Sequence, residues 1–351
     1  MAEKVLMKGN EALAEASIIA GCRHYFAYPI TPQNEISEYL SMRLPQKNGT
    51  FLQAESELAA INMVMGAAAA GARTMTSSSS PGISLKQEGI SYIAGCELPA
   101  VIVNMMRGGP GLGNISGSQG DYFQATKGGG NGDYRLIVLA PSTVQELADL
   151  TVDAFDYADQ YRMPVMILGD GFLGQMSEPV EMPKSTNKVF DKSSWALTGA
   201  ATRKPHIICS LRLGGDDELA RHNDVLQAKY KEIEKSISLY ETYLAKDADF
   251  LLTAFGTSAR ICRSAVDTLR KDGIKAGLFR PISLWPYPSK ELFSVSKNLK
   301  KVFVVEMNAG QMVEDVKLAF NGKVEVDFYG TLGGALPELD KIIDRVKDYA
   351  K

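Results

Sequence analysis

The stretch AVIVNMMRGGPG (Ala100–Gly111) joins a nearly continuous apolar run, Ala100–Met105, to a glycine-rich turn. A continuous run indicates a strand that is buried on both faces, as in a parallel sheet, whereas an alternating pattern would indicate one solvated face. Similar runs recur through the first half of the chain, at His24–Tyr28, Thr50–Gln53, Arg73–Ser77, Arg135–Ala140 and Pro164–Gly169. Together these six segments predict one buried, mostly parallel sheet.

Helical patterns lie between these runs. One begins at Thr31, with Pro32 at the first helical position, and another is the Ala- and Met-rich segment Glu55–Ala70. Proline is favoured at the first position because the N–H that it lacks would be unpaired there anyway. The alternation of strand and helix predicts a doubly wound α/β domain over residues 1–180.

Two further parts follow this domain. Residues 181–247 are predicted to be a linker with one long amphipathic helix, because apolar residues recur at helical spacing at Leu219, Leu226, Tyr230, Ile233, Ile237, Tyr240 and Leu244. This stripe is interpreted as core or interface, and not as a cofactor site. A second strand–helix alternation starts at Asp249 and predicts a smaller α/β domain over residues 248–351.

The composition is that of a soluble globular protein, with 45% hydrophobic and 23% charged residues among 351. A net charge of -3 gives no electrostatic reason to expect binding to nucleic acid or to an anionic membrane. No apolar stretch approaches the roughly 18–20 residues that span a bilayer, and Met1–Val5 does not resemble the start of a signal peptide. We therefore expect a cytoplasmic protein without membrane or nucleic-acid partners.

The chain offers little material for metal binding or for a Ser-His-Asp set. Its four cysteines are far apart, without a C-x-x-C pair, which argues against a zinc site or an iron–sulfur cluster built locally by this chain. Only three histidines are present. We expect reduced and mostly buried cysteines, no metal ligands in this chain, and chemistry carried by carboxylates, an arginine or a bound cofactor.

Polar residues follow four successive strands of the predicted sheet. Ligands of open parallel sheets bind beyond the carboxyl ends of the strands, where the chain turns into a helix. The four turns are Tyr28–Pro32, Gln53–Glu57, Ser77–Gly82 and Met106–Gly111. A site built from them would contain a hydroxyl at a helix N-terminus, a carboxylate beside apolar neighbours and a guanidinium on a glycine-rich loop.

Each candidate side chain has a structural interpretation beside the functional one. Thr31 before Pro32 is a good helix cap, a role that is compatible with anion binding. Arg107 is either a solvated loop arginine or a ligand contact. Glu55 and Glu57 are two residues apart, so in a helix they point to different sides. Glu57 precedes an apolar run and should be the drier carboxyl, suited to proton exchange with a nitrogen base.

The glycine-rich stretch Gly108–Gly132 follows one of these turns. It matches neither the dinucleotide pattern G-x-G-x-x-G nor the phosphate-binding pattern G-x-x-x-x-G-K-[ST]. We therefore interpret it as a long active-site loop and not as a phosphate cradle.

Longer motifs cover the same turns and strands. They are YPITP (Tyr28–Pro32), QAESELAA (Gln53–Ala60), SSSSPGISLKQEGI (Ser77–Ile90), MRGGPGLGN (Met106–Asn114), QATKGGGNGDYRLIVLAP (Gln124–Pro141), PVMILGDGFLGQM (Pro164–Met176) and VFVVEMNAGQM (Val302–Met312). In this order they closely resemble the pyrimidine-domain (alpha-type) subunit of 2-oxoacid:ferredoxin oxidoreductases. The likeness runs essentially end to end and is nearest to the 2-oxoisovalerate (3-methyl-2-oxobutanoate) type.

The resemblance implies a thiamine-diphosphate pyrimidine-binding domain followed by a transketolase-C-terminal-like domain. It also implies an enzyme that oxidatively decarboxylates a branched-chain 2-oxo acid to acyl-CoA and CO₂ and reduces ferredoxin. By the same resemblance, Glu57 bonds the aminopyrimidine ring and is catalytic, Thr31 and Arg107 bind the substrate's carboxylate and keto oxygen, and Pro29 and Ser80 line the cofactor.

The resemblance further implies partner chains. The diphosphate and Mg²⁺ would be held by a diphosphate-domain (beta-type) subunit and [4Fe–4S] clusters by a ferredoxin-like iron–sulfur subunit, with a gamma-type subunit in the same complex. External ferredoxin would take the electrons and coenzyme A the acyl group. Gly169-Asp170-Gly171 looks like the start of the family's magnesium motif, but Asn187 is too close to complete it, so we interpret Asp170 as a strand-end turn residue.

Three alternatives stay open at this point. The same chemistry on 2-oxoglutarate or pyruvate differs only in the substrate. A nicotinamide-dependent dehydrogenase is compatible with the fold class, although the expected glycine motif is missing. A scaffold subunit without catalytic residues is the third alternative.

Overall fold

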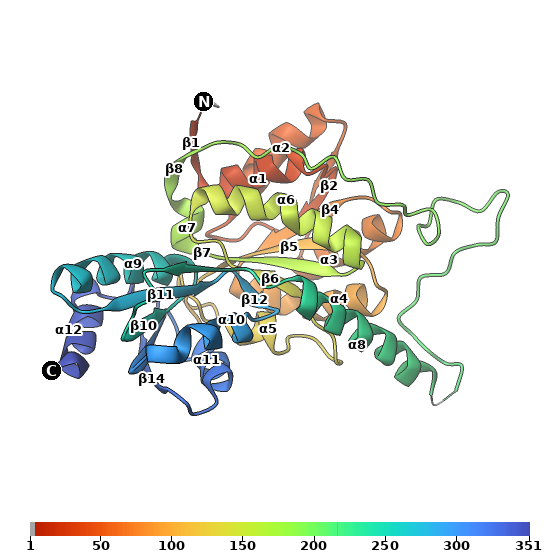
Figure 1. Cartoon of the computed structure of the whole chain (residues 1–351). Helices are drawn as coiled ribbons and strands as arrows, with labels where there is room; N and C mark the ends of the chain where they lie inside the picture. Colours follow the sequence, from red (N-terminus) through yellow and green to blue (C-terminus); the bar gives the residue numbers. More distant parts are fainter. Residues whose placement is uncertain (1–3, 216) are drawn as a thin grey trace.

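A seven-stranded sheet forms the centre of the larger part of the molecule (Figure 1). The structure is a computed structural model that describes residues 4–215 and 217–351. Residues 1–3, which begin the stretch Met1–Val5 considered above, lie outside the described residues. The strands stand in the order β12-β6-β7-β5-β4-β2-β3. They are β2 (His24–Ala27), β3 (Thr50–Gln53), β4 (Thr74–Ser78), β5 (Ala100–Met106), β6 (Ile137–Leu139), β7 (Pro164–Asp170) and β12 (Ser283–Trp285).

Six of these strands run parallel, and helices cover both faces of the sheet. One face is covered by α1, α2 and α6, and the other by α3 and α4. The helices of this part are α1 (Gly9–Ile19), α2 (Asn34–Gln46), α3 (Glu57–Ala69), α4 (Ser80–Gly95), α5 (Tyr122–Thr126), α6 (Val144–Tyr161) and α7 (Gly171–Gln175). A short antiparallel pair, β1 (Val5–Lys8) with β8 (Ser177–Val180), lies beside them. The predicted doubly wound α/β domain is confirmed.

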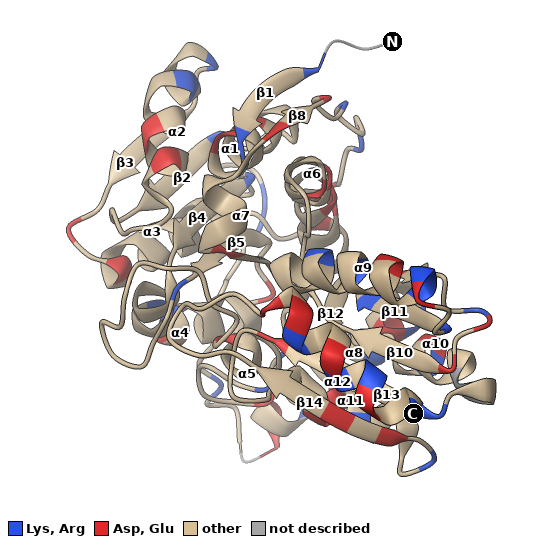
Figure 2. Ribbon diagram, turned by 90° about the vertical axis from the view of Figure 1, so that its left-hand side faces the viewer, with Lys and Arg blue, Asp and Glu red and all other residues tan. Residues whose placement is uncertain are grey.

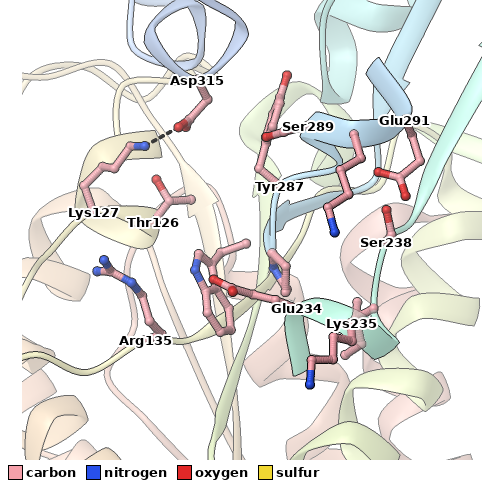
Figure 3. A pocket seen from close by; sticks show the side chains of 14 residues that line it. Thr126, Lys127, Arg135, Glu234, Lys235, Ser238, Tyr287, Ser289, Glu291 and Asp315 are labelled. Carbon is pink, nitrogen blue, oxygen red and sulfur yellow. Dashed lines mark hydrogen bonds and ion pairs between the residues drawn. The ribbon is translucent and has the colours of Figure 1, made fainter. Parts of the chain in front are cut away.

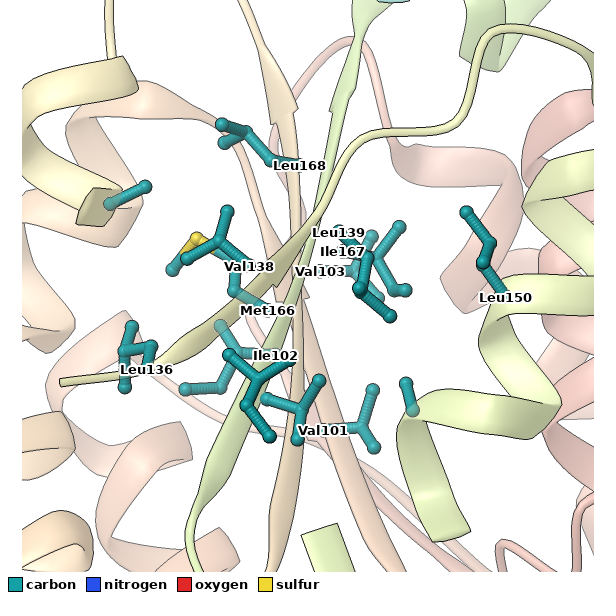
Figure 4. Close-up of a cluster of buried hydrophobic side chains, with 14 of the residues drawn as sticks. Val101, Ile102, Val103, Leu136, Val138, Leu139, Leu150, Met166, Ile167 and Leu168 are labelled. Atoms are coloured by element: carbon teal, nitrogen blue, oxygen red, sulfur yellow. The ribbon is translucent and has the colours of Figure 1, made fainter. Parts of the chain in front are cut away.

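The central strands are buried on both faces, as their apolar runs predict. Val101 and Val103 of β5 and Ile167 of β7 are completely buried, and Figure 4 shows side chains of this cluster on both sides of the strands. Each such side chain stabilises the fold by roughly 1.5–3 kcal/mol. The sheet is therefore a rigid platform for the turns at its carboxyl edge.

A second, five-stranded sheet has the order β14-β13-β10-β11-β9. Its strands are β9 (Tyr240–Tyr243), β10 (Phe250–Thr253), β11 (Ala276–Pro281), β13 (Lys301–Glu306) and β14 (Glu325–Gly330), of which only β9 is antiparallel to its neighbour. Its helical elements are α9 (Gly256–Lys271), α10 (Ser289–Ser294), the 3₁₀ turn η1 (Val295–Asn298), α11 (Met312–Phe320) and α12 (Leu339–Ala350). The predicted smaller α/β domain is confirmed as a fold.

The segment after β11 returns to the large sheet. There β12 pairs antiparallel with β6, with Ser283 opposite Leu139 and Trp285 opposite Val138. No sequence pattern predicted this strand, because three residues are too few for a periodic signal. The division of the chain at residues 180 and 247 stays a prediction.

The amphipathic helix is shorter than predicted. It is α8 (Glu218–Ser236), and the stripe that was expected to continue to Leu244 instead becomes strand β9. There Tyr240 stacks on Phe279 of β11, with the ring centroids 5.2 Å apart. Pairing with an open sheet edge outweighed helical periodicity in this segment, since tertiary contacts commonly override local propensity.

The surface charges do not separate by sign. Figure 2 shows Lys and Arg interspersed with Asp and Glu over α9 and α12, whereas the charged residues of β14 are the acidic Glu325 and Asp327 alone. Within the described residues, none of the helices is both long and apolar enough to cross a bilayer.

Candidate active site

The four polar turns meet at one edge of the large sheet. Strands β3, β2, β4 and β5 are neighbours and run parallel, so their carboxyl ends lie side by side. The first three turns lead into α2, α3 and α4, and β5 leads into the glycine-rich loop 107–121. The prediction that these turns come together is therefore confirmed.

Glu57 is the first residue of α3. The hydroxyl of Ser56 caps this helix by accepting a hydrogen bond from the Ala59 N–H at 3.1 Å. Glu57 is 6% exposed, whereas Glu55, outside the helix, is exposed. The prediction that Glu57 is the drier carboxyl is confirmed. The start of the helix turns Glu57 towards the protein and leaves Glu55 at the surface.

The first turn of α4 lies against the Glu57 carboxyl. A Cβ atom on Gly82 would lie 2.6 Å from Glu57 Oε1 and closer still to the Ser78 hydroxyl. A residue without a side chain is therefore required at this position. The hydroxyls of Ser78 and Ser79 are buried, and neither has a hydrogen-bond partner in the part of the chain that the structure describes. Gly82 thus makes room for the Glu57 carboxyl beside the hydroxyl of Ser78.

A buried lysine lies one helical turn beyond Gly82. The amino group of Lys86 donates hydrogen bonds to Thr76 Oγ1 at 2.6 Å and to Ser77 O at 3.0 Å. Burial lowers the pKa of Lys86 to about 7, and the charge of Glu57 partly opposes this lowering. Lys86 was not among the candidate residues, although its spacing of four from Gly82 puts both on one face of the helix.

Arg107 begins the loop after β5 and is 9% exposed. Its Nη1 donates to the main-chain carbonyl of Thr31 at 3.0 Å and its Nη2 to that of Leu112 at 3.1 Å. Within residues 4–215 and 217–351 it forms no ion pair, and its buried Nε has no hydrogen-bond partner. A buried guanidinium without a carboxylate is costly unless a ligand supplies the anion, so this environment excludes the solvated-loop interpretation.

Ser80 connects the start of α4 to Arg107. Its hydroxyl accepts a hydrogen bond from the Arg107 N–H at 3.0 Å and lies 2.6 Å from a carboxylate oxygen of Asp121. Asn104 donates to the same oxygen at 2.9 Å. Burial raises the pKa of Asp121, and the two hydrogen bonds partly oppose the rise. Ser80 therefore positions the main chain of Arg107, and Asp121, which no motif indicated, positions Ser80.

Thr31 and Pro29 lie nearer the surface than the other candidates. Thr31 is exposed, and its main-chain carbonyl, not its hydroxyl, contacts Arg107. The prediction that Thr31 caps a helix is wrong, because a turn closed by Gln33 N–H and Ile30 O at 3.1 Å precedes α2 and Gln33 occupies the cap position. Pro29 lines a hollow of about 260 Å³ between β3 and α2.

The loop that carries Arg107 is held by the second sheet. Gln119 Nε2 donates to Phe255 O at 2.7 Å, and Gln119 Oε1 accepts from Ser258 Oγ at 2.8 Å and from Met307 N at 3.0 Å. Asn308 Nδ2 also donates to Gln119 O at 2.8 Å. These buried bonds fix the end of the loop, so Arg107 is not carried by a freely moving segment.

Asp170 is the N-cap of α7 and lies at the junction of the two sheets. Its carboxylate accepts hydrogen bonds from Leu173 N at 3.1 Å, from Thr257 Oγ1 at 2.8 Å and from Thr257 N at 3.2 Å. Burial raises the pKa of Asp170, and these bonds partly oppose the rise. The interpretation of Asp170 as a strand-end turn residue is supported, because its carboxylate oxygens already accept hydrogen bonds from Leu173 and Thr257.

A larger hollow lies elsewhere, between α5, α8, α11 and the segment 285–291 (Figure 3). It measures about 550 Å³ and contains the ion pair of Lys127 with Asp315. None of the five candidate residues lines it. The hollow is therefore separate from the edge of the sheet where Glu57 and Arg107 lie.

Comparisons with known proteins agree with this architecture. The family described as "Pyruvate flavodoxin/ferredoxin oxidoreductase, thiamine diP-bdg" matches residues 15–241, and "Pyruvate:ferredoxin oxidoreductase core domain II" matches residues 248–342. Ketoisovalerate oxidoreductase subunit VorB of Methanothermobacter marburgensis is 50% identical over 345 residues, which are 98% of this chain and 97% of that protein.

Two solved structures have a similar fold. A 2-oxoglutarate:ferredoxin oxidoreductase from Magnetococcus marinus, with 2-oxoglutarate, coenzyme A and succinyl-CoA bound, has a TM-score of 0.90 and 28% identity, and the match covers 100% of this chain and 66% of that chain. A split-gene transketolase in an inactive beta4 tetramer has a TM-score of 0.60 at 14% identity, with 97% of each chain covered, a likeness in fold alone.

The two sheets and the matching families define an α/β protein of the transketolase-like, thiamine-diphosphate-binding class. Within this class, the chain belongs to the 2-oxoacid:ferredoxin oxidoreductase family. Enzymes of this family depend on thiamine diphosphate and use ferredoxin as electron acceptor. The dehydrogenase and scaffold alternatives are set aside by this membership.

Proposed function

We propose that the chain is the pyrimidine-domain subunit of a complex that oxidatively decarboxylates a branched-chain 2-oxo acid, with 2-oxoisovalerate as the preferred substrate. The products are the acyl-CoA, CO₂ and reduced ferredoxin. The relative named for ketoisovalerate, 50% identical over 98% of the chain, supports this substrate. The same chemistry on 2-oxoglutarate or pyruvate is the alternative, since the more distant solved structure acts on 2-oxoglutarate.

The residues around Glu57 fit the aminopyrimidine of thiamine diphosphate. A buried carboxyl can share a proton with a ring nitrogen. The absence of a side chain at Gly82 leaves room for the Glu57 carboxyl beside the Ser78 hydroxyl. The hydroxyls of Ser78 and Ser79, which have no hydrogen-bond partner in the described part of the chain, can bond further polar atoms of the ring. When bound, thiamine diphosphate supplies the nucleophilic carbon that attacks a keto group.

In this proposal Glu57 holds a proton at the ring nitrogen of the aminopyrimidine. The low exposure of its carboxyl keeps water from competing for that hydrogen bond. Ser80 and Pro29 line the cofactor side of the turns after β4 and β2. Ser80 also holds the main chain of Arg107 through its hydroxyl.

Arg107 and Thr31 bind the carboxylate and keto oxygen of the substrate. One observation carries the proposal: a buried guanidinium that has no acidic partner among the described residues lies on the same sheet edge as the buried carboxyl of Glu57. An arginine presents N–H groups in a fork that matches a carboxylate. The exposed position of Thr31 leaves its hydroxyl available to the substrate.

The complex contains further subunits that supply the remaining groups. A diphosphate-domain (beta-type) subunit holds the diphosphate and Mg²⁺, because the carboxylate of Asp170 is already occupied by α7 and Thr257 in this chain. A ferredoxin-like subunit carries the [4Fe–4S] clusters, a gamma-type subunit completes the assembly, and external ferredoxin accepts the electrons. Coenzyme A takes the acyl group, and the complex works in the cytoplasm.

The test compares kcat/KM of the purified complex for 2-oxoisovalerate, pyruvate and 2-oxoglutarate. The proposal expects the highest value for 2-oxoisovalerate, and a higher value for either other acid would reassign the substrate. Glu57→Gln should abolish ferredoxin reduction, while Glu55→Gln, two residues away and exposed, should leave it intact. Full turnover by Glu57→Gln, or by this chain without its partners, would overturn the proposal.

A further inference from the structure

We propose that Cys96 and Cys209 form a reversible disulfide, which fastens the linker segment 181–215 to the end of α4 when the protein meets a low-molecular-weight disulfide. The inference is independent of the proposed function, because neither cysteine lies in the turns that carry Glu57 and Arg107. It assigns a modification site to two of the four cysteines.

The linker segment runs beside the end of α4. It leaves β8 without regular secondary structure and continues to α8 (Figure 1). Cys96 is the C-cap of α4, and a Cβ atom on the preceding Gly95 would lie 3.7 Å from Ser210 Cβ. This is ordinary van der Waals contact, so residues 95 and 210 face each other across the two segments.

Two hollows beside this contact show how the neighbouring residues are paired. Gly95, Ser210 and Leu211 line one hollow. Cys96 and Cys209 line another, of about 370 Å³. The order of the lining residues therefore places Cys209, and not Leu211, opposite Cys96. A disulfide joins cysteines whose Cα atoms are about 4.4–6.8 Å apart, a separation that residues facing each other across touching segments reach.

The two thiols differ in their access to solvent. Cys209 is exposed, whereas Cys96 is 7% exposed, so an oxidant in solution meets Cys209 first. Burial raises the pKa of the Cys96 thiol, the Ser210 hydroxyl opposes the rise, and the charge that Cys209 carries once it is ionised adds to it. Arg162 and Arg212 line the same hollow, and nearby cations favour the thiolate that attacks a disulfide.

The surroundings of the pair argue against a metal site. Among the described residues, no group of three or more His, Cys, Asp or Glu side chains could hold a metal ion. Glu97, the acidic residue on the wall of the hollow, is paired with Lys229 at 2.8 Å. Cys22 and Cys262 are completely buried, so a solvent oxidant should leave them reduced.

The chemistry is thiol–disulfide exchange. The Cys209 thiolate attacks one sulfur of the small disulfide, forms a mixed disulfide and releases one small thiol. Cys96 then loses its proton to solvent and attacks the Cys209 sulfur, which forms the Cys96–Cys209 bond and releases the second small thiol. The two protein thiols lose two electrons, and the small disulfide gains them. Because the bond ties the linker segment to α4, it should restrain local opening of that segment.

The test uses the purified full chain, reduced and then incubated with glutathione disulfide. Thiols that remain are alkylated after unfolding and counted by mass spectrometry. The count should fall from four to two, with Cys96 and Cys209 in one linked peptide, and dithiothreitol should restore it. In Cys96→Ser, Cys209 should instead keep one glutathione. The control Cys262→Ala, which removes a cysteine outside the pair, should still form the bond.

Trypsin cleavage after Arg212, close to Cys209 in the sequence, reports on the linker segment. The oxidised wild type should be cleaved several-fold more slowly than the reduced protein. Cys209→Ser, a change at an exposed position that should not disturb folding, should be cleaved at the same rate with and without glutathione disulfide. A glutathione adduct on wild-type Cys209 that never passes to Cys96, a bond between two chains, or equal cleavage of oxidised and reduced wild type would overturn the inference.

Discussion

Replacing Lys86 with methionine should change how the stability of the protein depends on pH. Burial lowers the pKa of Lys86 from 10.5 to about 7, whereas the unfolded chain keeps the ordinary value. Below pH 7 both states hold the proton. Between pH 7 and 10.5 the unfolded chain holds a proton that the folded chain lacks, so the free energy of unfolding rises with pH. The cost of burying the charge is therefore fully present below pH 7 and disappears towards pH 10.5.

The full cost corresponds to about 5 kcal/mol. From pH 7.0 to pH 8.5 the free energy of unfolding of wild type should rise by about 1.5 kcal/mol more than that of Lys86→Met. Burial also raises the pKa of Cys22, to about 12, and that of Cys262, which lowers stability at higher pH. Both cysteines are present in wild type and variant, so their contributions cancel in the comparison.

The assay is urea unfolding of the purified chain at the two pH values, followed by circular dichroism. Lys47→Met, at an exposed lysine after α2, is the control and should behave as wild type. If the free energy of unfolding changes equally for wild type and Lys86→Met between pH 7.0 and 8.5, the amino group has the same charge in the folded and unfolded chains. Burial would then not lower the pKa of Lys86.

Three further predictions concern the site and its surroundings. Arg107→Lys should lower kcat/KM for the 2-oxo acid by roughly 10- to 100-fold in steady-state assays. The reason is that one ammonium cannot bond the Thr31 and Leu112 carbonyls and also present two parallel N–H groups to the substrate. Unchanged kinetics would refute the role of Arg107 in substrate binding. Gly82→Ala should weaken thiamine diphosphate binding measured by calorimetry, since its Cβ would lie 2.6 Å from Glu57 Oε1, whereas Gly66→Ala, with open space around it, should bind normally. Asp170→Ala should lower the free energy of unfolding, measured in urea, by about 2–3 kcal/mol, because donors of Leu173 and Thr257 lose their acceptor. The Mg²⁺ dependence of the complex's activity should stay unchanged. A shift in that dependence would indicate that Asp170 binds the metal.

Much of the fold could be predicted from the apolar runs, because a strand that is buried on both faces has a continuous run of apolar residues in the sequence. The run Ala100–Met105 became β5, which extends one residue further. Thr50–Gln53 is β3 with the predicted bounds, but the prediction that it is buried on both faces is wrong, because it lies at the edge of the sheet and is mostly exposed. The short elements could not be found in this way. β12 has three residues, and β9 lies within a segment that also satisfies a helical period, so only pairing with β6 and β11 decides their structure.

Candidate residues could be selected where a turn follows a predicted strand. Glu57 and Arg107 were selected because each lies in such a turn and has a side chain suited to a charged ligand; the structure shows both to be buried, and their roles stay predictions. Lys86 and Asp121 were missed because nothing local distinguishes a buried lysine in a helix, or an acidic residue in a loop, from a solvated one. Their importance depends on packing between α3, α4 and the loop 107–121, which sequence spacing alone does not specify.

The antiparallel strand β12 makes the two halves of the polypeptide interdependent. A protein that ended at residue 247 would leave the backbone groups of β6 that face β12 without hydrogen-bond partners, and an open strand edge readily recruits another chain. A subunit divided between two polypeptides at this point would therefore present an unprotected edge at β6 until the second polypeptide supplied β12.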